Sequence, residues 1–254
     1  MNSRSLGRPA AVLFDLDGTL LDTAGDIALA LSRAFADHGR QGPPPAAVRQ
    51  MIGKGAPVLV ERATAAQAWA LDAAGRAELL ERFFHHYGRL QDMKEFTAEP
   101  DEGAQEALAA LYEAGMPLAV VTNKFHRFAV GLLQQLDLMR YLRLVVGGDT
   151  CERRKPDPLP LRHACAELGV APARALMVGD SANDTEAARA AGMPVVLVPY
   201  GYTEGQDPRL LPCDHRVRSL AELPGLIADL SADLSADLSA DLSAGLSAGL
   251  SARQ

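Results

Sequence analysis

The sequence predicts an α/β fold in which a parallel, Rossmann-like sheet forms the core and an α-helical cap is inserted after the first strand. Five short runs rich in Val and Leu are apolar throughout, without alternation, which is typical of parallel strands buried on both faces. Roughly 100 residues separate the first run from the second, far more than one helical crossover requires. This gap predicts the inserted cap. The five runs are residues 10–14, 116–122, 142–149, 175–180 and 193–199.

The gap between the first two runs has the signals of helices. Thr23 and Asp26 have the spacing of a capping box, which predicts a helix from about residue 24 to 38. The Gly-Pro-Pro-Pro stretch at 42–45 interrupts the chain, and further helical stretches follow without any strand-like run. We therefore expect a core of residues 1–21 and 98–227, a helical cap of residues 22–97 and a tail of residues 228–254.

The predicted tail is a repeat, with ADLS four times, AGLS twice and a final ARQ. A leucine at every fourth residue drifts by ~40° per repeat around an α-helix, so the leucines form no straight seam for a partner. A low-complexity tail that is dispensable and contributes no chemistry is the favoured interpretation. A helix for self-association is the alternative.

Composition excludes several classes of protein. Acidic residues outnumber Lys and Arg by 32 to 25 in a chain of 254 residues, whereas nucleic-acid-binding domains are usually basic. No apolar run approaches the ~18 to 20 residues of a membrane span, and the polar start is not a secretory signal. The three cysteines include no CxxC pair, which suits a reducing compartment. We expect a cytoplasmic protein, monomer or homodimer, that binds neither nucleic acid nor membrane.

The segment FDLDGTLLDT, residues 14–23, contains two carboxylates at the end of the first predicted strand. Open parallel sheets usually bind their ligands at that edge. Because side chains alternate along an extended chain, Asp15 and Asp17 point to the same side. Two carboxylates that face one point repel each other unless a cation or a proton lies between them. One is suited to act as nucleophile and ion ligand, and the other as general acid and base.

Three later elements carry polar groups of matching chemistry. Thr122 and Asn123 end the second strand, where a hydroxyl and an amide are suited to phosphate oxygens. Lys155 precedes a proline and supplies a point charge for a phosphoryl group. Asp180 ends the fourth strand, and Asp184 follows in the first turn of the next helix. Carboxylate oxygens arranged in this way suit a hard ion such as Mg²⁺.

These four elements, in this order, resemble those of the haloacid dehalogenase superfamily of phosphohydrolases with a helical cap. Within that superfamily the chain is most similar to bacterial phosphoglycolate phosphatases, and the resemblance extends from about residue 10 to 227. It implies magnesium-dependent hydrolysis of 2-phosphoglycolate, a small phosphorylated metabolite, to glycolate and phosphate. The most similar segments are residues 52–63, 122–128, 147–158, 176–194 and 200–205.

The resemblance also implies a role for each matching residue. Asp15 attacks phosphorus to form an aspartyl-phosphate, and Asp17 protonates the leaving oxygen and then activates the hydrolytic water. These roles agree with the chemistry of phosphoryl transfer, in which the protein mainly positions the reacting groups and neutralises the charge of the phosphoryl group. The magnesium ligands are expected to be Asp15, Asp17 through its backbone carbonyl, and Asp180, with support from Asp184; the phosphoryl oxygens are expected to contact Thr122, Asn123 and Lys155.

Several alternatives remain open from the sequence. Where the family has Gly-Asn-Gly, this chain has Lys54 between two glycines; Lys54 either pairs with the substrate carboxylate or is a solvated loop charge. Asp17 argues against dehalogenase chemistry and against an imine mechanism on Lys54, because neither requires protonation of an ester oxygen. The same phosphatase chemistry on a sugar phosphate such as N-acetylmuramic acid 6-phosphate, or on pyrophosphate, is the main alternative. A non-catalytic phospho-accepting signalling module is more distant.

Overall fold

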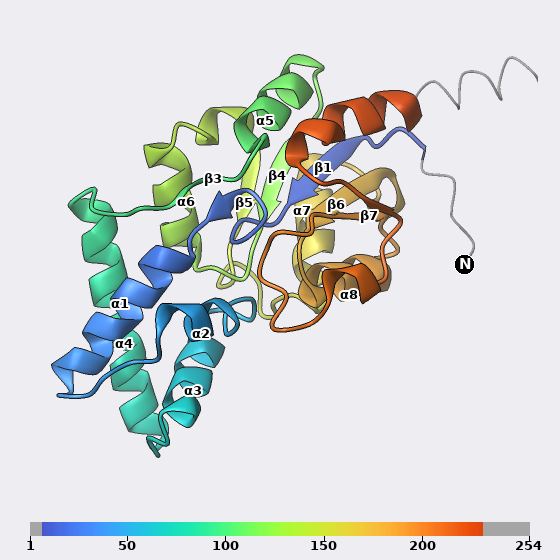
Figure 1. Ribbon diagram of the computed structural model, residues 1–254. Helices are drawn as coiled ribbons and strands as arrows, with labels where there is room; N and C mark the ends of the chain where they lie inside the picture. The colour runs from blue at the N-terminus through green and yellow to red at the C-terminus, as the bar shows by residue number, and fades with distance from the viewer. Residues whose placement is uncertain (1–6, 231–254) are drawn as a thin grey trace, which may run out of the picture.

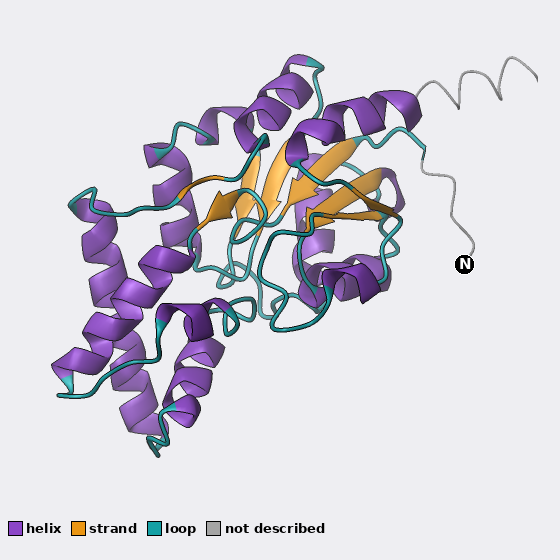
Figure 2. Ribbon diagram, viewed as in Figure 1, coloured by secondary structure: helices purple, strands orange, loops and turns teal. Residues whose placement is uncertain are grey.

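A six-stranded parallel sheet lies at the centre of the computed structural model, which describes residues 7–230 (Figures 1 and 2). The strand order is β5-β4-β1-β6-β7-β8, so β1 lies between β4 and β6. The predicted α/β class is confirmed, and the five apolar runs supply β1, β4, β5, β6 and β7. The strands are β1 (Ala11–Phe14), β4 (Leu118–Val121), β5 (Leu144–Val146), β6 (Ala175–Gly179), β7 (Val195–Leu197) and β8 (His215–Arg216).

Both faces of this sheet are covered by helices, as its apolar strands require. Val12 and Phe14 pack with α5 (Ala104–Glu113), α6 (His126–Gln135) and the helical residues 223–230, while Ala11 and Leu13 pack with α7 (Leu159–Leu168) and α8 (Ala182–Ala191). Alternate residues of one strand therefore enter two separate apolar layers. The edge strand β8 is only two residues long and exposed, so the sequence contains no apolar signal for it.

The helices α1 to α4 form a lobe beside the sheet, at the lower left of Figure 1. They have their own buried apolar cluster, to which α4 contributes Leu79, Phe83, Tyr87 and Leu90 at helical spacing. We refer to residues 24–92 as the helical lobe. Its helices are α1 (Ala24–Asp37), α2 (Pro45–Arg49), α3 (Ala56–Ala66) and α4 (Ala73–Asp92).

The lobe joins the core through two chain crossings that pair with each other. β2 (Leu21–Asp22) and β3 (Glu99–Pro100) form a short antiparallel ribbon. The capping box expected at Thr23 and Asp26 is wrong, because Asp26 makes no such contact. Its buried carboxylate instead accepts hydrogen bonds from the backbone N–H groups of Thr97 and Ala98, at 2.7 and 3.0 Å. Asp26 thus ties the outgoing chain to the returning chain at the base of the lobe.

The side chain of Asp101 lies beside this ribbon, and its carboxyl group lacks a hydrogen-bond partner among the described residues. Burial, together with the neighbouring charges of Asp22 and Glu99, raises the pKa of Asp101 to about 6. One of its oxygens is buried without a hydrogen-bond partner. Because the folded state holds this proton more tightly than the unfolded chain, the free energy of unfolding falls as pH rises from the ordinary pKa of 3.8 to about 6.

We expect Asp101→Asn to stabilise the protein at pH 7.5 by about 1 kcal/mol, which raises Tm by about 2–4 °C. The gain disappears near pH 4, where the wild-type carboxyl is already protonated in the folded state. Thermal unfolding followed by circular dichroism at both pH values measures this effect. Glu102→Gln, which removes an exposed neighbouring charge, is the control. An equal Tm change at both pH values would contradict the assignment.

Only residues 228–230 of the predicted tail belong to the described part of the chain. The expectation about the ADLS and AGLS repeats therefore lies almost wholly outside the described residues. Within residues 7–230, no helix has the length and apolar character needed to cross a membrane.

Candidate active site

Polar side chains from three neighbouring strands meet at one edge of the sheet. Asp15 follows β1, Thr122 and Asn123 follow β4, and Asp180 follows β6. Because β1 lies between β4 and β6 and all three strands are parallel, their carboxyl ends reach the same edge. The arrangement of the sheet therefore brings together residues that lie up to 165 positions apart in the sequence.

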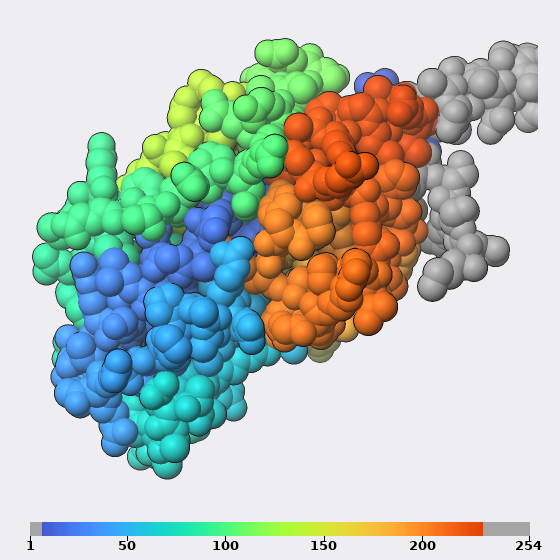
Figure 3. All heavy atoms as spheres, in the orientation of Figure 1, coloured from blue at the N-terminus to red at the C-terminus, as the bar shows by residue number. Residues whose placement is uncertain are grey.

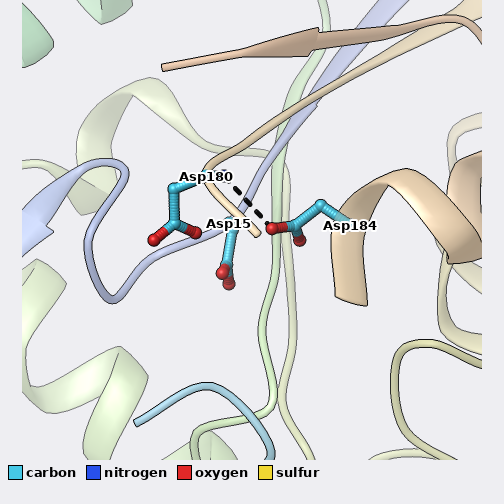
Figure 4. A group of neighbouring side chains, drawn as sticks. All are labelled: Asp15, Asp180 and Asp184. Atoms are coloured by element: carbon cyan, nitrogen blue, oxygen red, sulfur yellow. Dashed lines mark hydrogen bonds between the residues drawn. The ribbon is translucent and has the colours of Figure 1, made fainter. Parts of the chain in front are cut away.

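Three carboxylates form the centre of this site (Figure 4). Oxygen atoms of Asp15, Asp180 and Asp184 lie within 4.8 Å of one another, and the group could hold a metal ion. Burial raises the pKa of Asp15 to about 7, although the ammonium of Lys155 opposes this shift. Burial and the neighbouring carboxylates also hold the pKa of Asp180 well above its ordinary value. A bound cation would relieve the repulsion among these carboxylates.

Lys155 is buried between two of these carboxylates. Its Nζ atom lies 2.9 Å from Oδ1 of Asp15 and 2.7 Å from Oδ1 of Asp184, with 1% of the side chain exposed. Burial alone would lower the pKa of this ammonium, but the two carboxylates keep the pKa above its usual value. Lys155 therefore remains charged directly beside Asp15.

Asp184 supports the turn at the start of α8. Its Oδ2 accepts hydrogen bonds from the backbone N–H groups of Asp180 and Ser181, at 3.2 and 3.1 Å, and from the Ser181 hydroxyl at 2.9 Å. Its other oxygen contacts Lys155. Both oxygens of Asp184 are thus engaged by the protein, which orients Asp180 and Lys155 toward Asp15.

Asp17 is held through a single oxygen. Its Oδ1 accepts hydrogen bonds from the Thr23 hydroxyl at 2.6 Å and from Nζ of Lys124 at 2.8 Å. No protein donor contacts Oδ2 among the described residues. Gly18, at φ +84°, turns the chain next to Asp17 in a conformation that favours glycine. Two donors therefore fix the carboxyl plane of Asp17 and leave Oδ2 without a protein donor among the described residues.

Lys124 is a site residue that the sequence did not predict. The side chain is 7% exposed, and besides Asp17 it contacts the ring of Tyr87 in the helical lobe, 4.7 Å from the ring centroid. The only sequence signal was its place directly after Thr122 and Asn123 at the end of a buried strand.

Two other predicted residues have surroundings that the sequence did not indicate. The amide of Asn123 donates to the carbonyl oxygens of Gly53 and Lys155, both at 2.9 Å. Asn123 therefore joins a loop of the lobe region to the core instead of presenting its N–H groups to a phosphate.

Lys54 is exposed and does not line the cavity, although Gly53 and Gly55 do. This position matches a solvated loop charge.

A cavity of about 50 Å³ lies between the helical lobe and the carboxyl edge of the sheet. On a scale where ~10–15 Å³ holds one water molecule, it admits a small group. The lobe and the core are in contact beside it: Glu204 accepts a hydrogen bond from Asn183 at 2.9 Å and pairs with Arg62 of α3. Figure 3 shows the lobe packed directly against the segment near residue 200.

Tyr202 connects the carboxylate cluster with the base of the lobe. Its backbone N–H donates to Asp180, and its side-chain hydroxyl donates to Asp22 at 2.6 Å. The same hydroxyl oxygen accepts from the N–H groups of Thr23 and Ala24, at 2.8 and 3.0 Å. One buried side chain thus links the start of α1 with the loop that holds Asp180.

Comparison with known proteins agrees with this geometry. Residues 12–198 match the haloacid dehalogenase-like hydrolases. A phosphoglycolate phosphatase from Thiobacillus denitrificans is 45% identical over 213 residues, which cover 84% of this chain and 92% of the relative. One from Nitrosospira multiformis is 43% identical over 218 residues, with 85% and 95% covered.

Solved structures show the same fold. The crystal structure of a predicted phosphoglycolate phosphatase from Haemophilus somnus superposes with a TM-score of 0.80 at 29% identity, and the match covers 87% of this chain and 99% of that one. The fold, the carboxylate cluster and the sequence relatives lead to one conclusion. The chain belongs to the family of haloacid dehalogenase-like hydrolases.

Proposed function

We propose that this enzyme is a phosphoric monoester hydrolase that converts 2-phosphoglycolate to glycolate and phosphate. The observation that carries the proposal is Asp15, which lies at the end of β1 with Lys155 on one side and the Asp180 carboxylate on the other. A buried carboxylate between a fixed cation and a candidate ion site is suited to attack phosphorus. The sequence relatives named phosphoglycolate phosphatase support the choice of substrate.

In the first step, an oxygen of Asp15 bonds to phosphorus as the bond from phosphorus to the ester oxygen breaks. Asp17 gives a proton from Oδ2 to that oxygen, which leaves as the glycolate hydroxyl. In the second step, Asp17 takes a proton from a water molecule that attacks the phosphorus of the aspartyl-phosphate. The bond to Asp15 then breaks and phosphate is released. Thr23 and Lys124 keep Oδ2 of Asp17 aimed at the reacting oxygen throughout.

The phosphoryl group has two further donors in this proposal. Lys155 donates one N–H group to Asp184 and forms an ion pair with Asp15, so N–H groups remain for a phosphoryl oxygen. The Thr122 hydroxyl lines the cavity and accepts from the backbone N–H of Lys124, which leaves its own proton to donate. Asn123 positions the carbonyl of Lys155 and thereby the segment that carries this lysine.

We propose Mg²⁺ as the cofactor, held by Asp15, the backbone carbonyl of Asp17 and Asp180, with Asp184 in support. The residues fit a divalent ion: when all four carboxylates are ionised, the two ammonium groups of Lys124 and Lys155 leave two negative charges uncompensated. Carboxylate and carbonyl oxygens are also the donors that this hard ion prefers. When bound, the ion neutralises charge on the transferring phosphoryl group.

We further propose that residues 22–97 act as a cap over a core formed by residues 1–21 and 98–227. The apolar cluster of the lobe, which within the described chain contacts the core only through Phe128, Tyr202 and Phe125, and the two paired chain crossings support a lobe that moves as a unit. The contacts of Gly53 with Asn123 and of Arg62 with Glu204 hold it against the core. Closure excludes bulk water while the aspartyl-phosphate forms.

The small cavity favours 2-phosphoglycolate over a sugar phosphate. Aliphatic and aromatic side chains form most of its lobe side, so the hydroxyl groups of a sugar would be buried there without partners. Turnover of a panel of esters with Mg²⁺ tests this choice. We expect kcat/KM for 2-phosphoglycolate to exceed the values for glucose 6-phosphate, N-acetylmuramic acid 6-phosphate and pyrophosphate by at least about tenfold. A sugar phosphate that leads by that factor would contradict the substrate but not the chemistry.

A further inference from the structure

The cavity is lined by a second polar group besides the cluster of Asp15, Asp180 and Asp184. Of the described residues that line it, Lys124 is the one with a basic side chain. Lys155 lies deeper, beside Asp15, and is not part of the cavity wall. Lys124 uses one N–H group on Asp17, and an ammonium has three to donate. A cation with donors to spare therefore faces the part of the cavity next to the proposed general acid.

Tyr87 places a hydroxyl group near Lys124. It belongs to α4 of the helical lobe, is 2% exposed and lines the cavity. Its ring lies against Nζ of Lys124, 4.7 Å from the centroid. Its hydroxyl oxygen is buried and makes no hydrogen bond of normal geometry among the described residues, although Lys124 lies close enough to interact with it. A buried hydroxyl group without a well-formed hydrogen bond is costly, and a ligand that accepts from this hydroxyl would complete the site.

The other side chains on the lobe side of the cavity are apolar. They are aliphatic or aromatic and offer no hydrogen-bond donors. They include Ile27, Ile52, Leu59, Phe83 and Phe84.

We propose that Lys124 and Tyr87 form a binding site for the carboxylate of the leaving group. The substrate class is then phosphate esters of small 2-hydroxy acids, in which the ester carbon directly bears the carboxylate. This inference rests on the proposed function and identifies the residues that select its substrate. The ammonium and the hydroxyl each donate to one carboxylate oxygen.

The location of Lys124 agrees with the size of such a substrate. Lys124 contacts Oδ1 of Asp17, while Oδ2 of Asp17 is the oxygen left for the ester oxygen of the substrate. In 2-phosphoglycolate a single methylene group separates that ester oxygen from the carboxylate carbon. A group that touches the general acid can therefore also reach the carboxylate. The positive charge also offsets the repulsion between the substrate carboxylate and Asp17.

The test compares two esters that differ only at the proposed contact. In 2-hydroxyethyl phosphate, a hydroxymethyl group replaces the carboxylate of 2-phosphoglycolate. For each variant we compare the preference, defined as the ratio of kcat/KM for 2-phosphoglycolate to kcat/KM for 2-hydroxyethyl phosphate, at saturating Mg²⁺. Lys124→Met is expected to lower this preference by about 100-fold, because a charged hydrogen bond is lost. Tyr87→Phe is expected to lower it by about tenfold and keeps the packing of the ring.

Two variants serve as controls. Thr23→Val removes the other donor to Oδ1 of Asp17, so it is expected to slow both esters equally and leave the preference unchanged. Lys94→Met removes an exposed lysine outside the cavity and is expected to change neither rate. Thr23→Val therefore measures how the loss of one hydrogen bond to Asp17 alone changes the two rates.

The outcomes separate this inference from the proposed function. If Lys124→Met keeps the wild-type preference, for example by slowing both esters equally, the carboxylate site is wrong and the proposed function stands. If the wild-type enzyme itself hydrolyses both esters without preferring 2-phosphoglycolate, the proposed substrate is wrong. If Lys124→Met does not fold, Tyr87→Phe decides: an unchanged preference in that variant overturns the proposal.

Discussion

Asp15→Asn is expected to reduce kcat for 2-phosphoglycolate, and for a generic aryl phosphate, by at least about 10⁴-fold. The amide has nearly the shape of the carboxylate but is not a nucleophile, so the aspartyl-phosphate cannot form. Steady-state phosphate release measures the loss. After mixing with ³²P-labelled substrate and quenching in acid, wild-type protein should carry label and the variant should carry none.

Folding of the variant must be checked separately, because Asp15 also contacts Lys155 at 2.9 Å. Circular dichroism and thermal unfolding provide that check. Asp92→Asn, an exposed residue at the end of α4, is the matched control and should retain full activity. Turnover within tenfold of wild type in folded Asp15→Asn would refute the nucleophile assigned here.

Removal of divalent cations has the second large expected effect. Excess chelator should reduce turnover to background, and added Mg²⁺ should restore it. Without the cation, the buried carboxylates of Asp15 and Asp180 have raised pKa values and repel one another. A bound divalent cation would keep both ionised and would balance the charge of the site.

Thermal unfolding gives a readout of the same site that does not depend on activity. At 100 times its dissociation constant, Mg²⁺ should stabilise the wild-type fold by about 2.7 kcal/mol. Asp180→Asn should lose most of this stabilisation, and Asp92→Asn should retain it. Phosphatase activity that persists in excess chelator, or an Mg²⁺-dependent Tm that is unchanged in Asp180→Asn, would exclude the proposed ion site.

Both predictions concern residues that local sequence already identified. Asp15 and Asp180 each end a run of apolar residues, and short buried runs of this kind predict parallel strands directly. Once the strands are parallel, their last residues must share an edge of the sheet. The fold class and the candidate cluster thus followed from patterns a few residues long, because burial on both faces leaves a strong local signature in the sequence.

Other features have no such signature. Lys124 and Asp17 are 107 positions apart, and nothing near either residue predicts their contact. The spacing of Thr23 and Asp26 indicated a helix cap, yet the carboxylate of Asp26 binds the chain 71 and 72 positions later. From the sequence, Lys124 could equally have been solvated and Asp26 could have capped its own helix. Only the folded chain brings each side chain to its distant partner.

The sequence by itself determined which residue types carry the chemistry and that strand ends would present them, because apolar periodicity and short motifs are local properties. The tertiary structure alone decided which donors these residues use. It buried Lys124 against Tyr87 and left Lys54 exposed, although each lysine follows a small or polar residue in a predicted loop. The physical reason is that the packing of the lobe against the core sets the burial of a charge and the direction of its hydrogen bonds.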